Sequence, residues 1–119
     1  MKYVILIHSN PTTRHVWEGL TDEQRRQFGQ AHLDFGQHLI DTGQLVAAEG
    51  LADIDQARFV SVTGDETLVT DGPFAEVKEY LAGFYVVECA TIDDATALAA
   101  TLPDARNTHV EVRPVLNLR

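Results

Sequence analysis

The chain has 119 residues, of which 18 are acidic, 9 are lysine or arginine and 45% are hydrophobic. This length and composition fit one globular domain, residues 1–119, with a single hydrophobic core. The formal net charge of −9 opposes both the phosphate backbone of nucleic acids and anionic membrane surfaces, so the sequence predicts neither as a partner.

The cysteine content and the N-terminus indicate a compartment. The single cysteine, Cys89, cannot form an internal disulfide, which suits a reducing environment. The apolar run at residues 3–7 is too short for a signal peptide, and no apolar run approaches the roughly 18 residues that span a membrane. We therefore expect a cytoplasmic protein.

The first predicted elements are a strand and a long helix. Residues 2–8 are apolar on both alternating faces, as in a strand at the middle of a sheet. Residues 12–20 predict a loop or a short helical turn. The capping box that begins at Thr21 predicts a helix up to Thr42, with Gly43 as the left-handed residue that ends it. The apolar side of this helix carries Phe28, His32, Phe35 and Leu39.

The second half of the chain predicts strands and one more helix. The predicted segments are a strand at 44–52, a hairpin of 59–62 with 67–70, a strand at 83–89, a helix from Thr91 to Pro103 and a strand at 110–115. This order predicts an α+β fold of the ferredoxin-like kind, with an antiparallel sheet and two helices on one face. The uncovered face of the sheet needs a cover, and a second subunit is the simplest one.

One stretch, residues 69–79, concentrates turn-forming, aromatic and charged residues between two predicted strands. Pro73 fixes its own φ and disfavours the helical region for Gly72, which tolerates dihedrals that other residues do not. A fixed loop of this kind is typical of a site. The candidate binding residues are Gly72, Pro73, Phe74, Glu76 and Lys78. The alternative is a tight turn with Phe74 packed into the core and a solvated run of charges.

The same stretch carries a family resemblance. The run Asp71-Gly72-Pro73-Phe74-Ala75-Glu76, followed by Lys78-Glu79 and Gly83-Phe84-Tyr85, resembles the signature of the YCII-related family, in its DGPF-domain branch. The similarity also covers residues 1–3, 50–51 and 111–114. The resemblance implies a dimeric α+β barrel, in which the sheets of two subunits face each other, and hence a homodimer.

His32 is the candidate catalytic residue. A buried imidazole needs hydrogen-bond partners, and a satisfied core histidine is the simplest interpretation. The helix around His32 also looks like the histidine helix of the wider family, whose site pairs a histidine with an aspartate. That family places the aspartate directly before a proline, where this chain has Leu102-Pro103. We therefore predict Asp71, in the fixed turn, as the partner of His32, with Asp104 as the alternative.

Other motifs for chemistry are absent from the sequence. The chain has no H-E-x-x-H, Cys-x-x-Cys or G-x-S-x-G motif and no glycine-rich phosphate loop. Cys89 lies in an apolar segment, which raises the pKa of a thiol and disfavours a nucleophile. We interpret His8 as a structural histidine and His109 as a surface residue. The sequence thus predicts no metal and no cofactor.

Two functions fit these observations. The first is a cofactor-independent acid–base enzyme of the lyase or isomerase type, acting on a small polar or aromatic molecule, in which His32 moves a proton and Asp71 orients it. A few relatives of the family resemble dehydrochlorinases of chlorinated aromatic diols. The second is a non-catalytic module that binds a ligand or a protein. DGPF-type domains resemble proteins found beside extracytoplasmic-function sigma factors, and an acidic surface suits a basic protein partner.

Overall fold

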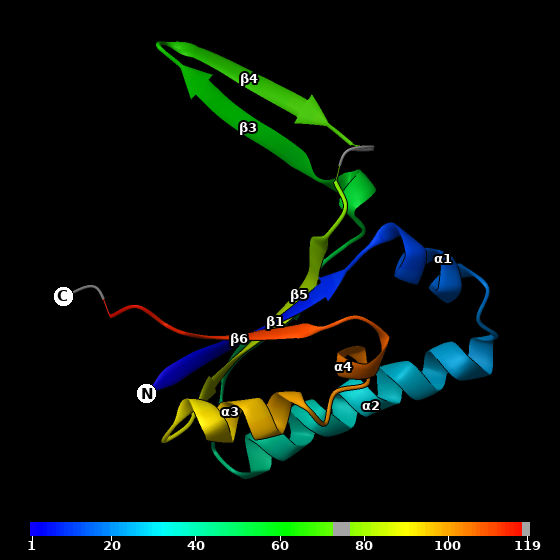
Figure 1. Ribbon diagram of the computed structural model, residues 1–119, viewed down its shortest axis with the longest axis vertical. Helices are drawn as coiled ribbons and strands as arrows, with labels where there is room; N and C mark the ends of the chain where they lie inside the picture. The colour runs from blue at the N-terminus through cyan, green and yellow to red at the C-terminus, as the bar shows by residue number, and fades with distance from the viewer. Residues whose placement is uncertain (73–76, 118–119) are drawn as a thin grey trace.

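The computed structural model describes residues 1–72 and 77–117, which form an α+β fold with an open antiparallel sheet (Figure 1). The elements are β1 (Lys2–Ser9), α1 (Pro11–Glu18), α2 (Asp22–Asp41), β2 (Leu45–Gly50), the short 3-10 helix η1 (Ile54–Gln56), β3 (Arg58–Thr63), β4 (Glu66–Asp71), β5 (Tyr80–Glu88), α3 (Ile92–Ala99), α4 (Asp104–Asn107) and β6 (Val110–Pro114). The predicted α+β class is confirmed.

The main sheet has the strand order β2-β5-β1-β6, and every neighbouring pair is antiparallel. The strand β1 therefore has a neighbour on both sides, as its two apolar faces predict. Ile5 of β1 pairs with Tyr85 of β5 and with Val112 of β6, so these three side chains point to the same face.

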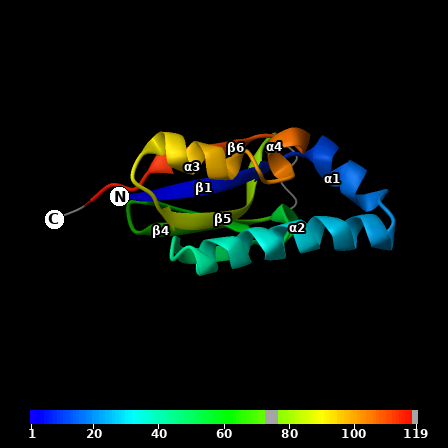
Figure 2. The same ribbon diagram turned by 90° about the horizontal axis from the view of Figure 1, so that it is seen from below.

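The helices α2 and α3 lie on that face of the sheet (Figure 2). Because side chains alternate along a strand, one set of strand residues meets the helices and the other set faces away. The core against the helices consists of Tyr3, Ile5, Ile7, Phe35, Leu39, Tyr85, Val87, Cys89, Ala95, Ala99 and Leu102. The opposite face of the central strands carries Val4, Leu6, Phe84 and Val86, which are only partly buried.

The helix boundaries follow from local capping. Thr21 and Gln24 form the predicted capping box at the start of α2, and Gly43 has a φ of 71° just after its end. The segment predicted as a loop or a short helical turn is the helix α1, because the Asn10 side chain caps it and Pro11 occupies its first turn. Within the part of the chain that the structure describes, none of the helices is long and apolar enough to cross a membrane.

The predicted hairpin is confirmed as β3 and β4, which form a separate two-stranded sheet. It extends away from the main sheet, and all of its residues are exposed (Figure 1). At the base of the hairpin, directly after β4, Gly72 does not have the positive φ that the sequence suggested. A glycine is favoured there because a Cβ atom would lie 2.7 Å from the backbone oxygen of Asp55.

Candidate active site around His32

His32 lies between two side chains with opposite hydrogen-bonding roles. Its Nε2 atom is 2.6 Å from Oδ1 of Asp104, and its Nδ1 atom is 2.8 Å from the hydroxyl oxygen of Tyr85. The side chains of His32 and Asp104 are 21% and 13% exposed, whereas Tyr85 belongs to the buried core. The site thus lies at the boundary between the buried core and the surface.

Three elements far apart in the sequence position these residues. His32 lies one turn before Phe35 on the apolar side of α2, where we expected it. Tyr85 points to the same side because it pairs with Ile5, which is fully buried under the helices. Asp104 is the first residue of α4, two residues after the buried Leu102. The anchoring of Leu102 in the core therefore sets the position of the carboxylate.

The hydrogen-bond partners assign the tautomer of His32. A carboxylate only accepts hydrogen bonds, so Asp104 requires a proton on Nε2. The Nδ1 atom then accepts a hydrogen bond from the hydroxyl of Tyr85. Burial, and secondarily the negative charge of Asp104, raise the pKa of Tyr85 above its ordinary value, so the phenol keeps its proton at neutral pH.

Aromatic rings enclose one side of the site. The rings of Phe28 and His32 are 5.0 Å apart, and Trp17 of α1 packs edge-on against Phe28 at 5.4 Å. The rings of Phe35 and Tyr85 meet at 4.8 Å in an edge-on contact. These apolar walls strengthen the hydrogen bonds of His32 by excluding water from part of their surroundings.

The structure does not bring Asp71 to His32, so the predicted pairing within one chain is wrong. Asp71 ends β4, is 72% exposed and forms an ion pair with Arg58 at 3.0 Å. The reason is the hairpin: Asp71 is the last residue of β4, and this strand lies away from α2 (Figure 1). The alternative carboxylate, Asp104, takes that position: it directly follows Pro103, whereas the family pattern places an aspartate directly before the proline.

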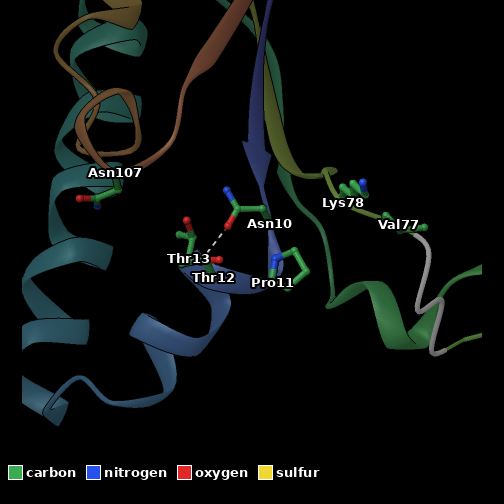
Figure 3. Close-up of a pocket in the computed structure, with 7 residues that line it drawn as sticks. All are labelled: Asn10, Pro11, Thr12, Thr13, Val77, Lys78 and Asn107. Atoms are coloured by element: carbon green, nitrogen blue, oxygen red, sulfur yellow. Dashed lines mark hydrogen bonds between the residues drawn. The ribbon is translucent and has the colours of Figure 1, made fainter.

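The predicted binding residues have different outcomes. Pro73, Phe74 and Glu76 lie outside the described residues. Gly72 lies against the backbone of Asp55. Lys78 lines a pocket with a volume of about 490 Å³ (Figure 3). The other residues that line this pocket are Asn10, Pro11, Thr12, Thr13, Val77 and Asn107.

This pocket and the histidine site share the helix α4. Asn107 lines the pocket, and Asp104 three residues earlier holds His32. Residues three apart on a helix lie on neighbouring parts of its surface. The lining of the pocket combines apolar residues with polar ones, and the side chains of Asn10, Lys78 and Asn107 are drawn around it in Figure 3.

Two features bear on what sequence reasoning found and missed. It missed Tyr85, although Tyr85 lies within the family signature and in a predicted strand; the missing signal was the strand register. It interpreted Cys89 as an unreactive thiol, and this residue is indeed buried, with burial as the main cause that raises its pKa.

The chain is thus a small α+β protein with a candidate acid–base site. In this site a histidine on a long helix contacts a tyrosine from the antiparallel sheet and an aspartate from the short helix α4. The chain belongs to the YCII-related family, because a sequence model of the YCII-related domain matches residues 1–119. It is also 31% identical over 118 residues to an uncharacterized protein from Rhizobium meliloti (strain 1021), covering 97% of this chain and 92% of that protein. The predicted family is confirmed, and the DGPF branch stays a prediction.

Proposed function

We propose that the protein is a cofactor-independent enzyme of the lyase or isomerase type, which uses His32, Asp104 and Tyr85 to move a proton on a small polar or aromatic molecule. The observation that carries the proposal is the pair of short hydrogen bonds on the two nitrogens of one partly exposed histidine. A cytoplasmic location is part of the proposal, supported by the single buried cysteine.

The proposed chemistry follows from the roles of the three groups. As a general base, Nδ1 of His32 receives a proton from the substrate directly or through Tyr85. In the second case the hydroxyl of Tyr85 transfers its own proton to Nδ1 and accepts the substrate proton in its place. The carboxylate of Asp104 stabilises the imidazolium that forms. In an elimination the leaving group departs as an anion and the imidazolium releases its proton to water. In an isomerisation the imidazolium returns the proton to another substrate atom.

The active unit that we propose is a homodimer with a ferredoxin-like subunit, in which the two sheets face each other as an α+β barrel. The order of β2, β5, β1 and β6 supports the subunit fold. The partly buried apolar side chains Val4, Leu6, Phe84 and Val86 on the face opposite the helices support the dimer, because a second copy would remove the rest of their surface from water.

A binding module is the second candidate function. The net charge of −9 and the hairpin with exposed Val60, Val62 and Leu68 favour a basic protein partner with an apolar contact, such as an extracytoplasmic-function sigma factor. Titration of a purified sigma factor of this class by calorimetry tests this function. Binding that is equal in the wild type and in His32→Ala, without turnover, would favour the module over the enzyme.

The enzyme proposal has two tests. In ¹⁵N NMR spectra at neutral pH we expect His32 to carry its proton on Nε2, and we expect Asp104→Asn to weaken this preference while Asp71→Asn leaves it unchanged. In a chloride-release assay on chlorinated hydroquinones, His32→Ala should abolish any turnover, whereas the folded control Asp71→Asn should retain it. An Nδ1–H tautomer in the wild type would contradict the proposed roles.

A further inference from the structure

A second group of titratable residues lies on the sheet face opposite the helices. Nδ1 of His8 is 3.0 Å from Oε1 of Glu79, and Nε2 of His109 is 2.8 Å from the same oxygen. The two imidazole rings stack with their centroids 4.9 Å apart. Oε1 of Glu111 is 2.9 Å from Nε2 of His8. Two histidines and two carboxylates are therefore in mutual contact.

The strand order explains why residues so distant in sequence meet. β1 ends where its antiparallel neighbours β5 and β6 begin. His8 lies near the end of β1, Glu79 directly precedes β5, and His109 directly precedes β6. The register of β1 and β5 shifts between Ile7 and His8, which is the irregularity expected where a strand re-aims a side chain. The cluster is thus fixed by three neighbouring strands of the sheet.

We propose that His8, Glu79 and His109 bind a divalent transition-metal ion of the zinc type. The nitrogen, oxygen and nitrogen atoms that they offer lie within 4.8 Å of one another, which is close enough for one ion to contact all three. Two imidazoles and one carboxylate are a ligand set that zinc uses at sites with an open fourth position.

Glu111 strengthens this assignment. Histidine ligands usually donate their second ring N–H to a carboxylate, which fixes the tautomer and orients the ring. Glu111 has this relation to Nε2 of His8, and the guanidinium of Arg113 holds Glu111 in turn, with Nε at 2.7 Å. With its proton on Nε2, His8 directs the lone pair of Nδ1 at the carboxylate of Glu79. A cation between these two atoms would be coordinated by both. A second proton on His8 is the alternative, and metal titration distinguishes the two.

The chemistry of the donors selects the class of ion. Ca²⁺ and Mg²⁺ prefer oxygen ligands, whereas imidazole nitrogens suit zinc and its neighbours in the first transition series. The cluster lies where β1 ends and β5 and β6 begin, and the side chains of His109 and Glu79 are 58% and 44% exposed in the single chain. An ion can therefore enter from this end of the sheet face that the proposed dimer covers, and keep a water or a small anion in its open position. The sequence predicted no metal because residues 8, 79 and 109 match no motif spacing.

Metal titration of the chelator-treated full chain tests the proposal, with Zn²⁺ and Co²⁺ as probes. We expect about one ion per chain, the intense visible bands of four-coordinate Co²⁺ and shifts of the His8 and His109 ring signals in NMR spectra. Glu111→Ala should weaken binding by about 10–100-fold. Glu79→Gln and His109→Ala, which change exposed ligands, should weaken it by more than Glu111→Ala does.

The exposed histidine of α1 provides the matched control: His15→Ala should bind the metal as the wild type does. Equal Co²⁺ affinity in the wild type and in His109→Ala would overturn the proposal. Ring signals of His8 and His109 that respond to pH but not to Zn²⁺ would also overturn it, and would make the cluster a network held by a second proton. Folding of each variant is checked from its amide NMR spectrum.

Discussion

Tyr85→Phe is the substitution that isolates the hydroxyl of the candidate site. It keeps the ring that packs edge-on against Phe35, and it removes only the oxygen that lies 2.8 Å from Nδ1 of His32. The free energy from burying the ring is therefore the same in wild type and variant, and it does not contribute to their difference in stability. A net hydrogen bond contributes about 0.5–1.5 kcal/mol to the free energy of unfolding. His32 is 21% exposed, so water can solvate the released nitrogen, and we expect a loss in the lower half of that range.

A double-mutant cycle measures this interaction. The free energy of unfolding is determined by urea denaturation for the wild type, Tyr85→Phe, His32→Ala and the double variant. A direct hydrogen bond predicts that the two losses are not additive, with a coupling on the order of 0.5–1 kcal/mol. Strict additivity would show that the hydroxyl and the imidazole do not interact in solution, and the proton path through Tyr85 would then be wrong.

Three other predictions test separate parts of the structure. Because the pKa of Tyr85 is raised, the folded state keeps a proton that the unfolded chain loses near pH ~10. The free energy of unfolding should therefore fall as pH rises above that value, and it should fall less steeply in Tyr85→Phe. Equal slopes of wild type and variant in urea denaturation at alkaline pH would contradict this. Gly72→Ala should lower the melting temperature because its Cβ would meet the backbone of Asp55. The control Gly29→Ala, which has open space around it on α2, should raise the free energy of unfolding by up to about 1 kcal/mol. An unchanged melting temperature in Gly72→Ala would refute the close approach. Val86→Lys on the uncovered face should convert the proposed dimer to a monomer in sedimentation velocity, because it would bury an unpaired charge in the interface. The control Leu33→Lys, at an exposed position of α2, should not change the oligomeric state. A monomeric wild type would remove the dimer from the proposal.

The elements of the fold were predictable because local signals and tertiary packing agree. Thr21 begins α2 through a capping box, Gly43 ends it in the left-handed region, and the turn at Gly64, with a φ of 61°, joins the two strands of the hairpin. The apolar residues on both faces of β1 indicated a strand at the middle of a sheet. The helix α1 was predicted only as a loop or a short helical turn, because most of its residues are polar and none is buried, so the cap at Asn10 was its main local signal.

The partners of His32 could not be predicted from the sequence in the same way. The apolar period of α2 indicated that His32 faces the core, but no local rule states which residues lie opposite. Asp71 was chosen for its place in a turn, and the direction in which the hairpin leaves the sheet overrode that choice. Tyr85 and Asp104 depend on strand register and on the chain path after α3, which are set by packing across the whole core.

The two candidate sites occupy opposite faces of the same strands, and this arrangement predicts that they act independently. Tyr85 points from β5 to the helices and contacts His32, whereas His8 and Glu111 lie on the face that the helices leave uncovered. The sheet backbone separates the two sets of side chains. A described link between the two sites is the hydroxyl of Thr108, which lies 2.7 Å from the backbone oxygen of His8 and 3.3 Å from that of Asp104, and it involves neither the imidazole of His8 nor the carboxylate of Asp104. His109→Ala should therefore weaken Co²⁺ binding and leave the ¹⁵N tautomer signature of His32 unchanged. His32→Ala should leave Co²⁺ binding unchanged. If Zn²⁺ shifted the His32 ring signals in the wild type but not in His109→Ala, the sheet would transmit the binding event, and the metal would regulate the proposed acid–base site.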